Sequence, residues 1–103
     1  MKTKSTPDQV KHELIPLIVT TAHRGVFFGY GVKTEAKIIR LERVRMCVYW
    51  SADVKGVLGL AVKGPSKYCK IGPQAPAATI QDVTSLVECS AESAAAWEAQ
   101  PWA

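Results

Sequence analysis

The fold is decided between residues 24 and 50, which read RGVFFGYGVKTEAKIIRLERVRMCVYW. Aromatic and β-branched residues dominate this stretch, and both favour the pleated surface of a sheet. Gly25 and Gly31 suit the turns at its boundaries. The pattern predicts strands over residues 26–30, 37–41 and 44–50, so we expect a mainly β protein built around this stretch.

The apolar residues of this stretch change parity, and the change predicts a bend. Two of them are odd-numbered, Ile39 and Leu41, and the four that follow are even-numbered, Val44, Met46, Val48 and Trp50. Because side chains of a strand alternate between its faces, one residue has to be absorbed for the apolar face to continue. We expect a bulge or tight corner near Glu42 and Arg43, and a sheet that curls. With the even-numbered face inward, Arg45, Cys47 and Tyr49 face outward.

The rest of the chain completes one small domain. A polar N-terminal arm, residues 1–13, precedes a predicted strand over residues 14–21. Apolar runs predict further strands over residues 57–62, at 69–71 and within 79–88. Ser90 is a suitable N-cap for a short helix that Pro101 ends, at about residues 90–100. We predict a single domain over residues 14–103: a small, strongly bent antiparallel sheet or partly open barrel with a short C-terminal α-helix.

The formal charge of +4 is unevenly distributed. Residues 1–45 carry nine Lys and Arg against four Asp and Glu, whereas residues 82–103 carry only acidic charges. This polarity suits an anionic ligand, self-association or ordinary solubility. No apolar run is long enough to cross a bilayer, and the N-terminus lacks the apolar core of a secretory signal. We expect a cytoplasmic protein with no membrane contact.

The cysteines favour packing over chemistry. The chain has three cysteines, Cys47, Cys69 and Cys89, which lie far apart in the sequence. An odd number of widely spaced cysteines is typical of an intracellular protein in which they are small buried hydrophobic residues. The sequence contains no C-x-x-C pair, and a tetrahedral metal site would need His12 or His23 as a further ligand. A Cys–His nucleophile pair has no local signature in this sequence. We therefore expect no metal, no cofactor and no enzymatic activity.

Basic residues beside strand aromatics form the candidate binding surface. Arginine contacts phosphate through paired hydrogen bonds, and exposed rings provide stacking platforms for bases. The basic, glycine-containing segment over residues 63–67 is a weaker phosphate candidate. It lacks the P-loop spacing and reads first as a hairpin turn. The candidate ligand-binding residues are Lys37, Arg40, Arg43, Arg45, Tyr49, Lys63, Lys67 and Lys70.

Two tryptophans near the C-terminus, Trp97 and Trp102, are candidate anchors. Their first interpretation is docking of the C-terminal helix on the sheet. The alternative is an exposed subunit interface, which edge-prone strands would extend.

Two resemblances add to this reading. Residues 24–30, followed by Ile39-x-Leu41, loosely resemble the first half of Sm-like and SH3-like small barrels. Most of the chain resembles a family of small uncharacterised proteins of tailed phages and prophages, through residues 21–30, 49–53, 56–61 and 69–73. This second resemblance implies an accessory phage product and carries no known activity or mapped site.

Two function hypotheses follow. The first is a non-enzymatic phage-type accessory protein, a homo-oligomer that binds an anionic partner, nucleic acid or nucleotide, through its basic β surface. The alternative is a structural or protein-interaction component that acts through homo-oligomerisation, as a virion or assembly part or as a binder of a host factor.

Overall fold

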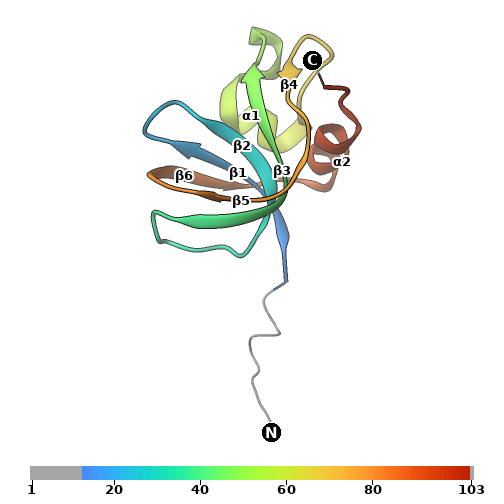
Figure 1. Ribbon diagram of the computed structural model, residues 1–103. Coiled ribbons are helices and arrows are strands. Elements are labelled where there is room, and N and C mark those ends of the chain that lie inside the picture. Colours follow the sequence, from blue (N-terminus) through green and yellow to red (C-terminus); the bar gives the residue numbers. More distant parts are fainter. Residues whose placement is uncertain (1–12, 103) are drawn as a thin grey trace, which may run out of the picture.

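The computed structural model describes residues 13–102 and confirms the mainly β fold. Six antiparallel strands form a curled sheet, and two α-helices gather at one end of it (Figure 1). In chain order the elements are β1 (Ile15–Thr21), β2 (Val26–Gly31), β3 (Ile39–Tyr49), the 3₁₀ helix η2 (Ala52–Val54), α1 (Gly56–Lys63), β4 (Lys70–Ile71), β5 (Ala75–Ile80), β6 (Val83–Glu88) and α2 (Ala91–Ala99). The predicted arm at residues 1–13 lies almost wholly outside the described residues.

The sheet curls without closing into a barrel. Its strands run in the order β6-β1-β2-β3. On its remaining side, β3 pairs with β5 through its first half and with β4 through its second half. Strands β5 and β6 follow one another in the chain, yet β5 pairs with β3 and β6 pairs with β1. The two outer strands are therefore joined by a short turn and not by a ladder.

The bulge predicted near Glu42 and Arg43 is confirmed. Phe28 pairs with Arg45 and Tyr30 pairs with Glu42, so β3 advances by three residues while β2 advances by two. Arg43 takes up the extra residue with a left-handed backbone, φ 49°. Val44 therefore stays on the same buried face as Ile39 and Leu41, as the parity change requires.

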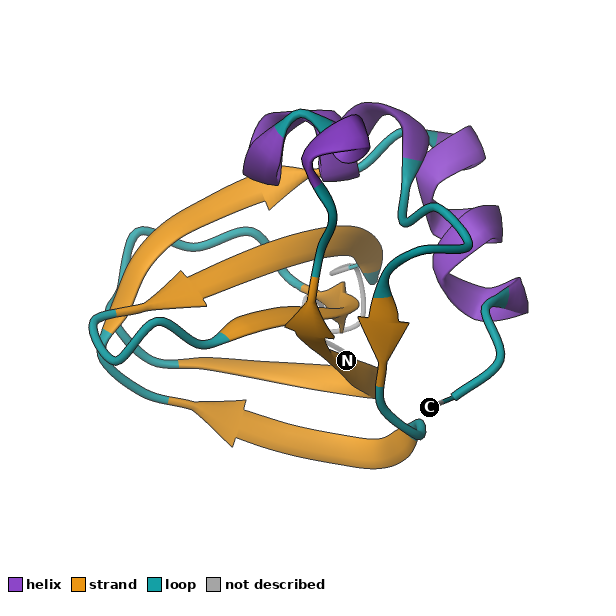
Figure 2. Cartoon of the chain, turned by 90° about the horizontal axis from the view of Figure 1, so that it is seen from above, coloured by secondary structure: helices purple, strands orange, loops and turns teal. Residues whose placement is uncertain are grey.

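Both faces of the curled sheet contribute buried residues, and these residues form two separate cores. One core lies within the curl and contains Leu17, Val19, Ile39, Leu41, Val44 and Ile80. The other lies between the sheet and the helices, which cover one side of it (Figure 2). It contains Ile18, Val26, Phe28, Cys47, Val54, Leu60, Ala61, Cys69, Ile71 and Trp97. Burial on both faces explains why the middle of β1, Leu17 to Val19, has three consecutive apolar residues.

The second core corrects the predicted facing of β3 beyond the bulge. Arg45 and Cys47, expected outside, are buried beneath the helices, whereas Met46 and Val48, expected inside, are exposed. The alternation itself was right. The wrong part was the choice of covered face, because α1 and α2 pack on the odd-numbered side of this half of β3. Tyr49 is exposed as expected, although it is odd-numbered, because the register with β4 shifts between Cys47 and Tyr49.

The prediction of a strand over residues 57–62 is wrong, because this segment forms helix α1. A short apolar run does not distinguish a strand from a buried helix by periodicity alone. Gly59 lets the helix lie against η2, since a Cβ at that position would stand 1.7 Å from the carbonyl oxygen of Val54. Residues 64–69 consequently connect α1 to β4, so the segment over residues 63–67 is not a hairpin turn between two strands.

Helix α2 confirms the predicted C-terminal helix. The Ser90 side chain accepts a hydrogen bond from the backbone N–H of Ser93 and so caps the helix start. Trp97 is fully buried and stacks on Phe28, with ring centroids 5.0 Å apart. Docking on the sheet is therefore the role of Trp97, which leaves no exposed face for a subunit interface.

Candidate functional site

Arg45 belongs to the interior and not to a binding surface. Its side chain is 5% exposed. The guanidinium donates to three backbone carbonyl oxygens, those of Gly72 at 2.8 Å, Trp97 at 2.7 Å and Gln100 at 2.6 Å. Two of these carbonyls lie at the C-terminal end of α2, where a cation is electrostatically favoured. Arg45 thus ties α2 to the sheet, and its predicted outward position is wrong.

Arg43 lies in a polar cluster that joins the bulge to α2. Its guanidinium carbon stands 3.9 Å from the centroid of the Tyr30 ring, and its Nη1 lies 3.8 Å from a carboxylate oxygen of Glu98. The Tyr30 hydroxyl donates a hydrogen bond to the same carboxylate. Partial burial and the Glu98 carboxylate raise the pKa of Tyr30 to about 12. The cation is therefore shared between a ring and a carboxylate.

Three further predicted residues lie away from one another. Arg40 forms an ion pair with Glu42 at 2.7 Å, and Lys63 forms one with Glu92 at 3.9 Å. Lys37 is exposed just before β3 begins, at the opposite end of that strand from Tyr49. The predicted basic residues therefore do not form one continuous β surface.

The structure does bring together three of the predicted residues around β4. Tyr49 is the cross-strand partner of Lys70, and Lys67 lies in the loop that leads into β4. Two exposed aromatic residues complete the group. Tyr68 lies beside Lys67, whose Nζ is 5.2 Å from the ring centroid. Trp102 forms a β-bridge with Ile71 on the other side of β4. We call these five residues, Tyr49, Lys67, Tyr68, Lys70 and Trp102, the β4 edge surface.

The aromatic residues of the β4 edge surface are more than half exposed to solvent. The exposed fractions are 53% for Tyr49, 62% for Tyr68 and 70% for Trp102. Neither Lys67 nor Lys70 forms an ion pair with a carboxylate within residues 13–102. Large rings gathered at a surface are typical of contact sites, and unpaired lysines add a local positive potential.

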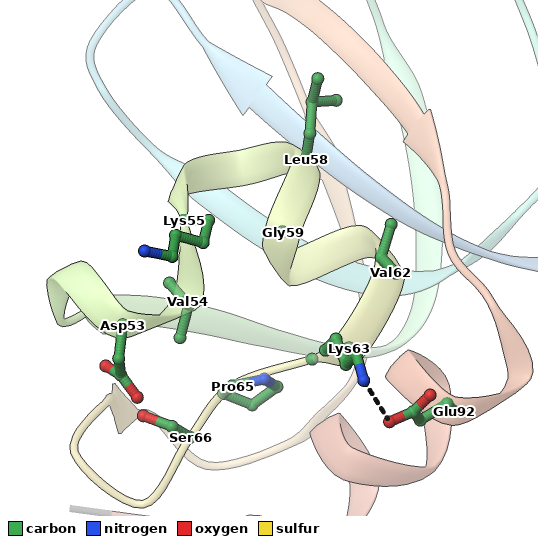
Figure 3. Close-up of a pocket in the computed structure, with 11 residues that line it drawn as sticks. Asp53, Val54, Lys55, Leu58, Gly59, Val62, Lys63, Pro65, Ser66 and Glu92 are labelled. Atoms are coloured by element: carbon green, nitrogen blue, oxygen red, sulfur yellow. Dashed lines mark ion pairs between the residues drawn. The ribbon is translucent and has the colours of Figure 1, made fainter.

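A groove beside α1 is the second candidate site (Figure 3). It encloses about 750 Å³ between α1, η2 and the segment after α1. Leu58 and Val62, one helical turn apart, expose their side chains along it. Asp53 and Ser66 face one another at one end, and the Lys63–Glu92 pair lies at the other. Hydrogen bonds from the hydroxyls of Ser51 and Ser66 lower the pKa of Asp53.

The segment over residues 63–67, considered above as a phosphate site, lies against α2. Gly64 is buried with φ 82°, and a Cβ there would stand 2.6 Å from the Cβ of Ala96. Pro65 is also buried. This backbone packs on the helix and does not form an open loop for an anion.

The cysteines are packing residues, as predicted. All three are free thiols. Cys47 and Cys69 are buried, and Cys89 is half-buried. Burial raises the pKa of both Cys47 and Cys89 to about 11, which disfavours the reactive thiolate. Across residues 13–102 no three His, Cys, Asp or Glu side chains converge as metal ligands. No helix in the same range has the length and apolar character to cross a membrane.

One comparison with known proteins identifies the family. A model for a domain of unknown function, DUF6948, matches residues 14–97. The chain belongs to this family. Searches of curated proteins and of solved structures gave no match. Four of the five residues of the β4 edge surface lie within the part of the chain that the DUF6948 model covers, and Trp102 lies beyond it.

Sequence reasoning missed Tyr68 of the β4 edge surface and Leu58 and Val62 of the α1 groove in this DUF6948 chain. A signal for Tyr68 was present, because the ring lies between Lys67 and Lys70 in a loop segment. Leu58 and Val62 were assigned to a strand, and only the helical spacing of four residues places them on one exposed face.

Proposed function

We propose that this DUF6948 protein is a non-enzymatic binding module that engages a nucleic acid or nucleotide through the β4 edge surface. The observation that carries the proposal is the pair Lys67 and Lys70, beside exposed aromatic rings and without an ion-pair partner in residues 13–102. Among the other predicted cations, Arg45 is buried and Arg40, Arg43 and Lys63 are paired with carboxylates. Lys37 is exposed and has no ion pair within residues 13–102, but it lies at the other end of β3, away from these rings. Phosphate contacts are therefore best supported at β4.

Charge reversal tests this proposal. Lys67→Glu with Lys70→Glu should weaken DNA or RNA binding at least about tenfold and flatten its salt dependence, because two phosphate contacts are lost. Lys37→Glu is the matched control for each single reversal, Lys67→Glu or Lys70→Glu, since it makes the same charge change at the far end of β3 and should have a much smaller effect. Binding that is indifferent to salt, or that all three reversals weaken equally, would count against the proposal.

A second candidate function, protein interaction through homo-oligomerisation, is supported by the α1 groove. Leu58 and Val62 are apolar, exposed and adjacent on one helical face, which is the pattern of a contact patch. Mass measurement in solution tests it. The wild-type chain should form an oligomer, and Leu58→Glu with Val62→Glu should shift it to the monomer. Ile38→Glu, at an exposed apolar residue away from the helices, should leave the oligomer intact. A monomeric wild type would rule this function out.

We further propose that the protein has a phage-type accessory role in the host cytoplasm. For the protein-interaction function, we propose a virion protein or a host protein as the partner. The support is the sequence resemblance given above, over residues 21–30 and 56–61 among others. Fractionation of infected or induced cells tests this context. The protein should be found in the cytoplasmic extract or with particles. A gene without phage neighbours, or a protein confined to membranes, would contradict this context.

A further inference from the structure

The arrangement of the aromatic rings around β4 narrows the class of nucleic acid. Tyr49 and Trp102 flank β4 from its two sides, through the Tyr49–Lys70 pair and the Ile71–Trp102 bridge. Tyr68 lies two residues before Lys70 in the loop that enters the strand. Tyr49 and Lys70 are cross-strand partners and therefore share one face of the sheet. Lys67 and Tyr68 lie in the loop that enters β4, and Trp102 lies along the outer edge of β4 through its bridge to the buried Ile71.

The chemistry of this surface fits bases that are not paired. In a duplex the bases stack on one another, and their faces are not accessible to a protein ring. In a single strand each base has free faces that stack on an aromatic side chain, while lysines follow the phosphates. Two further exposed apolar residues of β3, Met46 and Val48, lie at this end of the sheet and extend the apolar area.

We propose that the ligand is a single-stranded nucleic acid, with bases stacked on Tyr49, Tyr68 and Trp102 and phosphates held by Lys67 and Lys70. This inference rests on the nucleic-acid binding proposed above and adds the strand class and the stacking residues. Of the acidic groups nearest in sequence, Glu98 is paired with Arg43. Asp53 keeps its charge, and its carboxylate is directed to the hydroxyl of Ser51.

The test is a titration of the full chain with a labelled single strand of about 12 nucleotides and with the duplex of the same sequence. The single strand should bind at least about tenfold more tightly. Tyr49→Ala, Tyr68→Ala and Trp102→Ala should each weaken single-strand binding by about fivefold or more. Tyr49→Phe and Tyr68→Phe retain the ring and should restore the affinity. Ile38→Ala is the control, because it truncates an exposed side chain outside both the β4 edge surface and the α1 groove.

The possible failures are distinguishable. Equal affinity for duplex and single strand, with no effect of the ring substitutions, would overturn this inference. If Lys67→Glu and Lys70→Glu still abolished binding, the proposed anion-binding surface would nevertheless stand. No nucleic-acid binding at low salt would overturn both proposals. Loss of an oligomer on substitution of the rings, without any effect on nucleic acid, would assign the surface to a protein contact instead.

Discussion

The two tryptophans near the C-terminus lie five positions apart in the sequence and in opposite surroundings. Trp97 is fully buried, stacks on Phe28, and offers its carbonyl oxygen to Arg45. Trp102 is mostly exposed, next to β4. Two of the predicted cations differ in the same way, because Arg45 is enclosed beneath α2 whereas Lys70 lies open at the edge of the sheet. The inner region holds the fold together, and the outer region is available for a ligand.

The largest expected effect comes from the tryptophans themselves. Trp97→Ala should lower the free energy of unfolding by about 3–5 kcal/mol, because it removes a buried ring and leaves a cavity. Trp102→Ala should change it by less than about 0.5 kcal/mol. Denaturant unfolding of both variants measures the difference. Similar losses for the two variants would mean that the inner and outer regions are not separate.

A smaller loss is expected at the buried cation. Arg45→Met keeps an apolar stem but leaves the carbonyl oxygens of Gly72, Trp97 and Gln100 without their charged donor, which should cost about 2–3 kcal/mol of unfolding free energy. Arg40→Met removes only an exposed ion pair and should cost less than about 1 kcal/mol. Chemical denaturation of both variants gives the comparison. Equal stability of the two would show that Arg45 does not tie α2 to the sheet.

The smallest expected effect is on the pH dependence of stability, through the hydrogen bond of Tyr30 that links the bulge region to α2. The pKa of Tyr30 is raised from 10.0 to about 12, so the folded state holds the phenolic proton more tightly than the unfolded state does. The resulting stabilisation is complete below pH 10 and is lost as the pH rises towards about 12. Tyr30→Phe should remove this part of the pH dependence. Unfolding curves recorded across that range for both proteins measure it, and identical slopes would contradict the proposed hydrogen bond to Glu98.

Much of the fold was predictable from local patterns. The parity change between Leu41 and Val44 located the bulge, because a period of two leaves no other way to keep both residues buried. Ser90 and the alanine-rich segment after it located α2 through its cap and its helix propensity. Helix α1 was not predictable, since its short apolar run fits either element and its packing depends on the contact of Gly59 with Val54.

The candidate site was predictable only in part. Tyr49, Lys67 and Lys70 were identified as basic or aromatic residues near strands. Their association depends on β4, whose pairing with β3 involves residues about twenty positions apart. Arg45 was misplaced for the complementary reason. No local sequence feature of β3 shows that α2 covers its odd-numbered face. This tertiary contact decides whether Arg45 contacts a ligand or caps a helix.

The most direct test of the separation between the two regions is an NMR titration of the isotopically labelled chain with a single-stranded oligonucleotide. The account predicts that amide shifts concentrate at Tyr49, at residues 67–71 and at Trp102, while Arg45 and Trp97 remain unchanged. Shifts centred on the Lys37 end of the sheet, or spread evenly over both regions, would contradict it.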